Sequence, residues 1–430
     1  MSTSAPTAPE NGEVAVEEKV IPVVNRKTPI LLTLITLALA AAVVFGSQGG
    51  DTRFRLATKD DLFELPVVTV PAEATAFVMI GLMLLCCAES MRRVLSGRNT
   101  PLWLSVVFTF VGLVGFLAWA GAGGTIPVVG LLAGSLARAV PLIFGALGGV
   151  LGERSGVVNI AIDGQLLAGA FAAAMIGSVT GSVWAGTLGA AAAGLLVGLI
   201  LGVFAISFFV DQVIVGVVLN VLVIGLTSFM FSQVLAPNAA DLNSPPRFSS
   251  WEIPLLGEIP LVGPVLFQQT PIVYLLYITV AVVTWALYRT RWGLRVRAVG
   301  EHPKAADTVG INVRRTRYRT VLIAGAIAGA GGAFYTLVSV SQFNREMTGG
   351  AGYIALAAVI FGKWDPIRAT LAALLFGFAY NLQGVLSVIG SPVPSQFMLM
   401  LPYVVTIFAV AGLVGRSRPP AADGIPYKKA

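Results

Sequence analysis

Apolar segments long enough to cross a lipid bilayer recur along this sequence from Pro29 to Gly415. About 20 apolar residues are needed for a helix to span the hydrocarbon core, and a helix satisfies its backbone polar groups internally. Only 11% of the residues are charged, roughly half the share in a soluble domain. The sequence therefore predicts an all-α, polytopic membrane protein with about 10–12 transmembrane helices, some of them discontinuous.

Each predicted span is an apolar stretch bounded by polar or charged residues. One of them, 350–362, is short for a complete crossing, and we expect it to be re-entrant or half-buried. Within two spans glycines recur every four residues, which predicts close helix–helix packing there rather than a ligand site. The predicted spans are 29–48, 71–88, 101–121, 127–151, 158–180, 182–209, 213–236, 271–288, 320–341, 350–362, 368–390 and 397–415, and the glycines are Gly194, Gly198, Gly202, Gly325 and Gly329.

The distribution of Lys and Arg predicts the orientation in the membrane. The segment 289–319 contains nine basic residues and two acidic ones, whereas 237–270 contains one basic residue and three acidic ones. Cytoplasmic loops carry the excess of positive charge, so 289–319 is expected inside and 237–270 outside. Counting spans from there predicts a plasma-membrane protein with both termini in the cytoplasm. Residues 1–28 are polar and are expected to form a disordered cytoplasmic tail.

The same charges argue against several other functions. The net charge of +7 is accounted for by basic loops beside anionic lipid, and no nucleic-acid recognition motif accompanies it. With His302 as the one histidine and Cys86 and Cys87 adjacent within a span, no metal site and no cofactor are expected. No phosphate-binding P-loop is present, so any ATP that drives the protein must be bound by another subunit. The chain itself is not expected to be an enzyme.

One polar run interrupts the hydrocarbon character of the spans. Residues 153–169 read ERSGVVNIAIDGQLLAG and place Asn159, Asp163 and Gln165 at membrane depth. Such residues are costly there and are the default functional candidates. On a helix, Asn159 and Asp163 share a face, whereas Gln165 points about 200° away from Asp163. We expect the first two to face a pathway and Gln165 to bond a neighbouring helix.

Two alternatives stay open for this run. Residues 152–157 could form a tight cytoplasmic turn, or they could belong to a helix broken near mid-membrane, as transporters often use. Asp163 could contact a substrate, or it could only cap the backbone at the break.

The basic segment contains the second informative motif. Residues 292–315 read WGLRVRAVGEHPKAADTVGINVRR, in which Gly300 and Pro303 are expected to break the chain. Residues 304–309 are predicted to form a short helix that Gly310 ends. Its Ala305 and Ala306 are small enough to fit a groove in another protein. The alternative is an ordinary connector between helices.

These motifs resemble those of a known family. The pattern G-L-R-x-R-A-V-G-x-x-P-x-A-A-x-x-x-G-I resembles the coupling loop of ABC importer permeases of the branched-chain amino acid, simple sugar and nucleoside group. GALGGVLGERSGVVNIAIDGQLLAGAF, GGAGYIALAAVIFGKWDPIRA and SQFMLMLPYVVTIFAVAG resemble the nucleoside (purine-lipoprotein-associated) branch. The likeness covers about residues 127–415. Asn159–Gly164 lacks the Asp-Leu-Ser-Val run of ribose-type permeases, and Asp163 stands where most members of the nucleoside branch carry Glu.

The resemblance implies an organisation for the chain. It predicts a permease core at 122–415, with a cytoplasmic coupling loop at 289–319 and a cytoplasmic tail at 416–430. Residues 29–121 form a transmembrane extension for which the family offers no role. The expected partners are ABC ATPase subunits docked at 300–311, a second permease subunit, an extracytoplasmic substrate-binding lipoprotein and the lipid bilayer.

The resemblance and the polar residues together give a candidate site. A nucleoside needs aromatic or apolar walls with a few amide and hydroxyl groups. The substrate-pathway candidates are Asn159, Asp163, Gln165, Asn220, Phe343 and Asn381, and the ATPase-coupling candidates are Gly300, Pro303, Ala305, Ala306 and Gly310.

The expected function is the permease subunit of an ATP-driven nucleoside importer. Two alternatives are a sugar permease of the same group and an ion-coupled secondary transporter that uses Asp163 or Glu73. A third, a membrane scaffold without transport, leaves the coupling motif unexplained.

Overall fold

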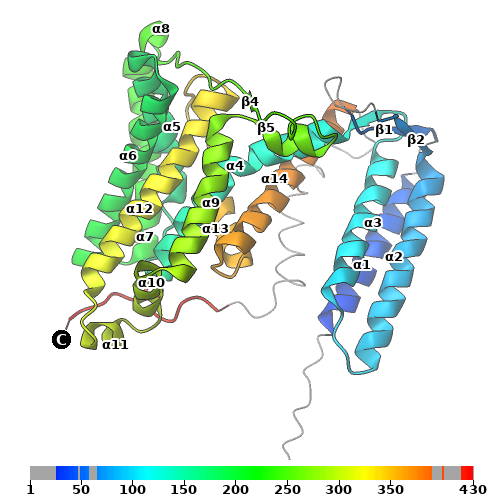
Figure 1. Cartoon of the computed structure of the whole chain (residues 1–430), viewed down its shortest axis with the longest axis horizontal. Helices are drawn as coiled ribbons and strands as arrows, with labels where there is room; N and C mark the ends of the chain where they lie inside the picture. The colour runs from blue at the N-terminus through cyan, green and yellow to red at the C-terminus, as the bar shows by residue number, and fades with distance from the viewer. Residues whose placement is uncertain (1–25, 47–48, 58–64, 390–399, 401–417, 430) are drawn as a thin grey trace, which may run out of the picture.

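The structure is a computed structural model that describes residues 26–46, 49–57, 65–389, 400 and 418–429 (Figure 1). Ten helices in this part of the chain are long and apolar enough to cross a membrane, which confirms the predicted all-α, polytopic fold. Apart from Met400, the last predicted span at 397–415 lies outside the described residues, as does most of the predicted tail at 1–28. The ten helices are α1 Lys27–Phe45, α2 Ala72–Leu95, α3 Leu102–Ala120, α4 Val128–Arg154, α5 Ile162–Thr180, α6 Val183–Gly202, α7 Gln212–Met230, α9 Pro271–Arg289, α12 Val313–Phe334 and α14 Pro366–Ile389.

Shorter elements connect or extend these helices. Three helices end in a π-helical turn, and five short strands form one three-stranded and one two-stranded sheet. The short helices are α8 Ala239–Leu242, α10 Arg291–Glu301, α11 Pro303–Thr308 and α13 Ala351–Phe361. The π-helical turns are η1 Val203–Ser207, η2 Phe231–Leu235, η3 Gly263–Phe267 and η4 Tyr335–Ser339, and the strands are β1 Asp51–Arg55, β2 Val68–Pro71, β3 Thr125–Pro127, β4 Trp251–Glu252 and β5 Gln268–Gln269.

Local sequence signals set where several helices begin. The Asp211 carboxylate accepts hydrogen bonds from the backbone of the first turn of α7, and Thr290 and Asn312 do the same for α10 and α12. These residue types satisfy backbone N–H groups that have no partner inside the helix. Proline opens α9, α11 and α14, where its missing N–H costs nothing.

Helices α1–α3 form a separate unit beside the core (Figure 1). They share a small apolar cluster of their own, and a three-stranded sheet with the order β2-β1-β3 joins them to the start of α4. Strand β1 pairs antiparallel to β2 and parallel to β3. Leu131 of α4 and Leu382 and Leu386 of α14 complete the cluster. The unit is therefore attached to the core at one end of the bundle.

Glycines bring α6 and α12 into close contact, as the four-residue spacing predicts. A Cβ at Gly194 would lie 2.2 Å from the Gly325 carbonyl oxygen, and one at Gly329 would lie 2.4 Å from the Ala190 oxygen. Gly169 of α5 meets Gly329 just as closely, with a Cβ only 2.1 Å from its carbonyl oxygen. Backbones approach this closely only without side chains, so these glycines pack helices rather than bind a ligand.

The two ends of the bundle differ in charge. We call the end that carries α10 and α11 the basic end, and the end that carries α8 and the β1–β3 sheet the far end. The turn between α2 and α3, which contains Arg98, and the C-terminal residues also lie at the basic end (Figure 1). Basic residues from distant parts of the chain thus gather on one side of the bundle.

Helix α13 completes a crossing and is not re-entrant. Gly145 of α4 lies against Ala355, and Gly149 lies against Val359, so α13 runs parallel to α4. Helices α12 and α14 both run antiparallel to α4. The chain between them therefore returns from the far end to the basic end, first as irregular backbone and then as α13. The predicted segment at 350–362 matches α13, which is too short to cross a membrane alone, as expected. Of the two predicted alternatives, the direction of α13 excludes a re-entrant segment, and its mixture of buried and exposed residues agrees with a half-buried one.

Candidate functional site

The polar run begins with a tight turn at the basic end. Helix α4 ends at Arg154, and the Val157 N–H returns to the Gly152 carbonyl at 3.1 Å. Gly156 has a φ of +84°, and a Cβ there would lie 2.7 Å from the Arg317 guanidinium. Both the backbone conformation and the close approach require glycine at this position.

The next residues enter the bundle without helical structure. The Val158 N–H donates to the Gln212 side chain at 2.7 Å, and the Ile160 carbonyl accepts from Asn220 Nδ2 at 2.9 Å. Helix α5 begins only at Ile162, which packs on Gly145, about 14 Å along α4 from its end at a rise of about 1.5 Å per residue. Both predicted alternatives thus apply: a turn at the end of the bundle, followed by a discontinuous helix that starts deep inside it.

Asp163 joins the first turns of α5 and α13. Its carboxylate accepts from the Gly352 N–H at 2.9 Å and from the Thr348 hydroxyl at 3.3 Å, and the residue is only 3% exposed. A Cβ at Gly352 would lie 2.2 Å from the Asp163 nitrogen, so the two backbones touch. Two helix N-termini, both electropositive, therefore surround one carboxylate, which stabilises its charge. The Asp163 carboxylate thus bonds backbone at a helix start, as one of the two predicted alternatives has it, and contact with a substrate stays a prediction.

Asn159 and Gln165 bond each other instead of facing different ways. Asn159 Nδ2 donates to Gln165 Oε1 at 3.0 Å, and Gln165 Nε2 donates back at 3.4 Å, with both side chains buried. The expectation that Asn159 and Asp163 share a helix face was wrong. It assumed a helix through both residues, but Asn159 precedes the helix that begins at Ile162.

Asn220 of α7 forms hydrogen bonds that link α7 to the non-helical residues before α5 and to α13. Its side-chain oxygen accepts from the Gly164 N–H at 2.7 Å, and its Nδ2 donates to the Ile160 carbonyl and to the Tyr353 hydroxyl at 3.1 Å. Tyr353 is itself 47% exposed. The polar cluster therefore consists of Asn159, Asp163, Gln165 and Asn220, and Tyr353 connects it to the protein surface.

The predicted coupling motif forms two helices, not one. The break falls at His302, between α10 and α11, and Pro303 is the first residue of α11. Gly300 was expected to break the chain, but it lies inside α10, where a Cβ would come within 2.2 Å of the Arg154 carbonyl oxygen. Because glycine has no side chain, α10 can contact the α4–α5 turn at Gly300.

The two alanines of the motif have different surroundings. Ala305 is exposed on α11, whereas Ala306 is 4% exposed and packs with Val299 and Val313. The expectation that both alanines are presented to a partner is wrong for Ala306, because it fills this small cluster. Gly310 is exposed and follows α11 with a φ of +83°.

The segment that resembles a coupling loop thus packs directly on the turn that opens the polar run. Residues 131–410 match the sequence model of the family described as the branched-chain amino acid transport system permease component. The chain belongs to this family of transport permeases. Membership and the ten apolar helices make it a multi-pass membrane protein, and permeases of this kind work with ATPase and binding-protein partners.

Three curated relatives are similar over most of their length. A guanosine ABC transporter permease protein of Bacillus subtilis is 42% identical over 310 residues, which is 69% of this chain and 95% of the relative. A nucleoside ABC transporter permease protein of Lactococcus lactis is 39% identical over 70% of this chain and 96% of its own. A provisionally named glucose ABC transporter permease of Haloferax volcanii is 34% identical over 67% of this chain and 92% of its own.

Two of the permease's predicted pathway residues lie outside the polar cluster. Phe343 is fully buried, and its ring packs edge-on against Phe171 at 5.3 Å. Asn381 of α14 donates to the Leu131 carbonyl of α4 at 2.7 Å, near the far end. These contacts pack and bond helices, and neither residue touches Asp163 or Asn220 in the described structure.

Sequence reasoning missed a charged residue in the permease core. Arg138 lies in the middle of α4, is exposed and donates no hydrogen bond to the described part of the chain. The Tyr335 hydroxyl lies within electrostatic range of Arg138, Asp163 and Tyr380. The sequence contains a signal for this residue, because a charged residue within a predicted span is by default a candidate functional residue.

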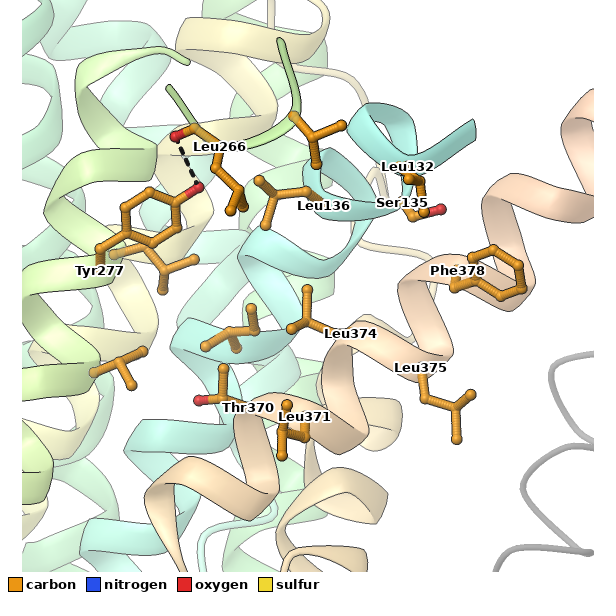
Figure 2. Close-up of a pocket in the computed structure, with 14 residues that line it drawn as sticks. Leu132, Ser135, Leu136, Leu266, Tyr277, Thr370, Leu371, Leu374, Leu375 and Phe378 are labelled. Atoms are coloured by element: carbon orange, nitrogen blue, oxygen red, sulfur yellow. Dashed lines mark hydrogen bonds between the residues drawn. The ribbon is translucent and has the colours of Figure 1, made fainter. Parts of the chain in front are cut away.

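A groove in the permease offers a contrasting environment (Figure 2). It has a volume of about 640 Å³ and lies between α4, η3, α9 and α14. Its walls are almost entirely apolar, and the hydroxyls of Ser135, Tyr277 and Thr370 already donate to backbone carbonyls. A nucleoside would find no polar partner here, so the polar cluster is the better candidate site.

Proposed function

We propose that this permease is the membrane subunit of an ATP-binding-cassette importer for nucleosides. The observation that carries the proposal is that the segment resembling a coupling loop packs on the turn that opens the polar run. The chain is also 42% and 39% identical to a guanosine and a nucleoside permease. The ATPase subunits dock at α11, a second permease subunit completes the membrane part, and a binding lipoprotein delivers substrate. The basic end faces the cytoplasm, in line with the positive-inside rule.

A continuous chain of contacts supports coupling between α11 and the polar cluster. Movement of α11 is transmitted through α10, because Gly300 rests on the Arg154 carbonyl. From there the chain runs through 155–161 to Asp163, which contacts the first turn of α13. A discontinuous helix can shift at such a break without losing its remaining hydrogen bonds. We infer that ATP binding moves α5 and α13 together and so opens the pathway to alternate sides.

The polar groups near Asp163 suit a nucleoside. Tyr353 and Tyr335 supply aromatic surface and hydroxyls, and Arg138 supplies donors that can reach base oxygen and nitrogen acceptors. Asn159 and Gln165 bond each other, so we assign them to holding the break rather than to contacting substrate.

Uptake by reconstituted complexes tests the proposal. Vesicles containing both permeases, the ATPase subunit and the lipoprotein should accumulate radiolabelled guanosine only with ATP, and omission of the ATPase should stop uptake. Accumulation that survives without the ATPase and collapses with an ionophore would instead support ion coupling through Asp163 or Glu73. Accumulation of glucose but not nucleosides would support the sugar alternative, which the 34% identical relative favours.

We predict that Arg138→Gln lowers nucleoside uptake about 10-fold without changing ATPase binding. Losing one charged hydrogen-bond donor costs about 1.5–3 kcal/mol, and 1.4 kcal/mol corresponds to a factor of ten. Arg368→Gln is the matched control, because Arg368 is exposed in the first turn of α14. Equal uptake by the two variants would remove Arg138 from the pathway.

A further inference from the structure

The C-terminal residues 418–429 lie along the basic end beside the coupling helices (Figure 1). The Ala422 N–H donates to the Gly300 carbonyl at 2.8 Å, and the Ala421 N–H donates to the Glu301 carboxylate at 3.2 Å. This segment follows residue 410, where the match to the family ends. Its contacts are therefore a property of this chain that the family match does not cover.

A buried arginine ties the segment to two other parts of the core. Arg317 of α12 is 2% exposed, and its guanidinium donates to the carbonyls of Ser155, Ile425 and Ala422 at 3.2, 2.9 and 3.5 Å. A buried charge is tolerated only when its donors find partners. The C-terminal segment supplies two of the three acceptors, and the α4–α5 turn supplies the third.

The last described residues lie against α11 itself. Tyr427 packs on the cluster of Val299, Ala306 and Val313. Lys429 lies 3.8 Å from the Asp307 carboxylate on α11, although both side chains are solvent-accessible and the pair contributes little alone. Backbone hydrogen bonds, the buried arginine and the tyrosine thus hold the segment in place.

We propose that residues 418–429 form a strap that fixes α10 and α11 against the α4–α5 turn and completes the surface on which the ATPase subunit docks. The strap touches α11, α12 and the turn that opens the polar run, so it joins the docking helix to the candidate site. Without it, α11 loses part of its packing, and the Arg317 guanidinium loses two acceptors. The inference rests on the proposed role of α11 in ATPase docking.

Binding of the ATPase subunit to the detergent-solubilised permease tests the strap. A chain ending at residue 417 should bind its ATPase about 10-fold more weakly than the full chain. Gly424→Val and Tyr427→Ala keep the strap's length and should also weaken binding, because Gly424 has a φ of +73° and Tyr427 packs on Ala306. Removing residues 2–20 is the control.

The readout needs no nucleoside, so it is separate from the test of the transported substrate. Wild-type affinity in all three strap variants would overturn the proposal. If the truncated chain does not fold, the two point variants test the proposal instead. Unchanged affinity for the ATPase subunit in both of them would then overturn it.

The docking of the strap should weaken as pH rises. Burial raises the pKa of the Asp423 carboxyl to about 7, although the Arg317 guanidinium and the Gly424 N–H favour its charged form. The Glu153 carboxyl of α4 faces it, and Asp423 Oδ1 has no hydrogen-bond partner. An undocked aspartate has a pKa of about 3.9, so the docked strap binds more protons. Docking is then strongest below about pH 4 and is progressively lost up to about pH 7.

Hydrogen–deuterium exchange of the strap measures this dependence. Protection of the Ala421 and Ala422 amides should fall between about pH 4 and pH 7 in the wild type and change little above that. In Asp423→Asn it should stay constant after correction for intrinsic exchange, because the amide carries no charge. Parallel profiles for the two proteins would contradict the assignment to Asp423.

Discussion

Replacing Ala305 with arginine is expected to abolish ATPase-driven transport while the permease still folds and inserts. Ala305 is exposed on α11, so the longer side chain has room in the isolated permease. In the complex it would place a large charged group in a contact shaped for a methyl group. An unpaired charge buried at an interface costs about 2–5 kcal/mol, which weakens binding by about 30-fold or more.

The measurement is ATPase binding and ATP-dependent uptake by the same preparation, with thermal stability as the check on folding. Ala240→Arg is the matched control, because Ala240 is exposed on the short helix α8 at the far end. Ala306→Arg should behave differently and destabilise the permease, because Ala306 is buried beside Val299 and Val313. Normal uptake by Ala305→Arg would show that α11 is not the docking helix.

The helices were predictable because the hydrocarbon core demands long apolar segments, and the sequence contains them. The start of α5 was not predictable from local sequence. Ala161 precedes the helix and offers no capping side chain. The backbone of the preceding residues is satisfied instead by Gln212 and Asn220, more than 50 residues away. A break stabilised by such distant partners leaves no signal within its own segment.

The prediction for Gly300 was wrong because the small size of this glycine matters in the structure, and not its flexibility. Gly300 looked like a chain break, but the structure uses it for contact with the Arg154 carbonyl inside a helix. The four-residue glycine spacing at Gly194 and Gly325 was informative because a period identifies a helix face. A single glycine carries no period, so its partner is visible only in three dimensions.

Replacing Asp163 should impair transport more than membrane insertion. Asp163→Ala leaves the buried Gly352 N–H and Thr348 hydroxyl without their acceptor, at about 1–3 kcal/mol each. It also removes the carboxylate that links the first turns of α5 and α13 at the helix break. We expect uptake to fall about 100-fold, because the two helices no longer move as one unit. Asp163→Asn keeps one acceptor oxygen and should lose about 10-fold.

Thr348→Val is the matched control, because it removes only the longer of the two hydrogen bonds and leaves the carboxylate in place. Uptake should be measured for several nucleosides at equal amounts of inserted protein, with ATPase binding in parallel. We expect uptake to be lost while ATPase binding stays unchanged. This result would show that the variants interrupt coupling at the Asp163–Gly352 contact and not docking at α11. Wild-type uptake of every nucleoside by both Asp163 variants would reduce this carboxylate to a packing role, because the coupling route proposed here passes through it.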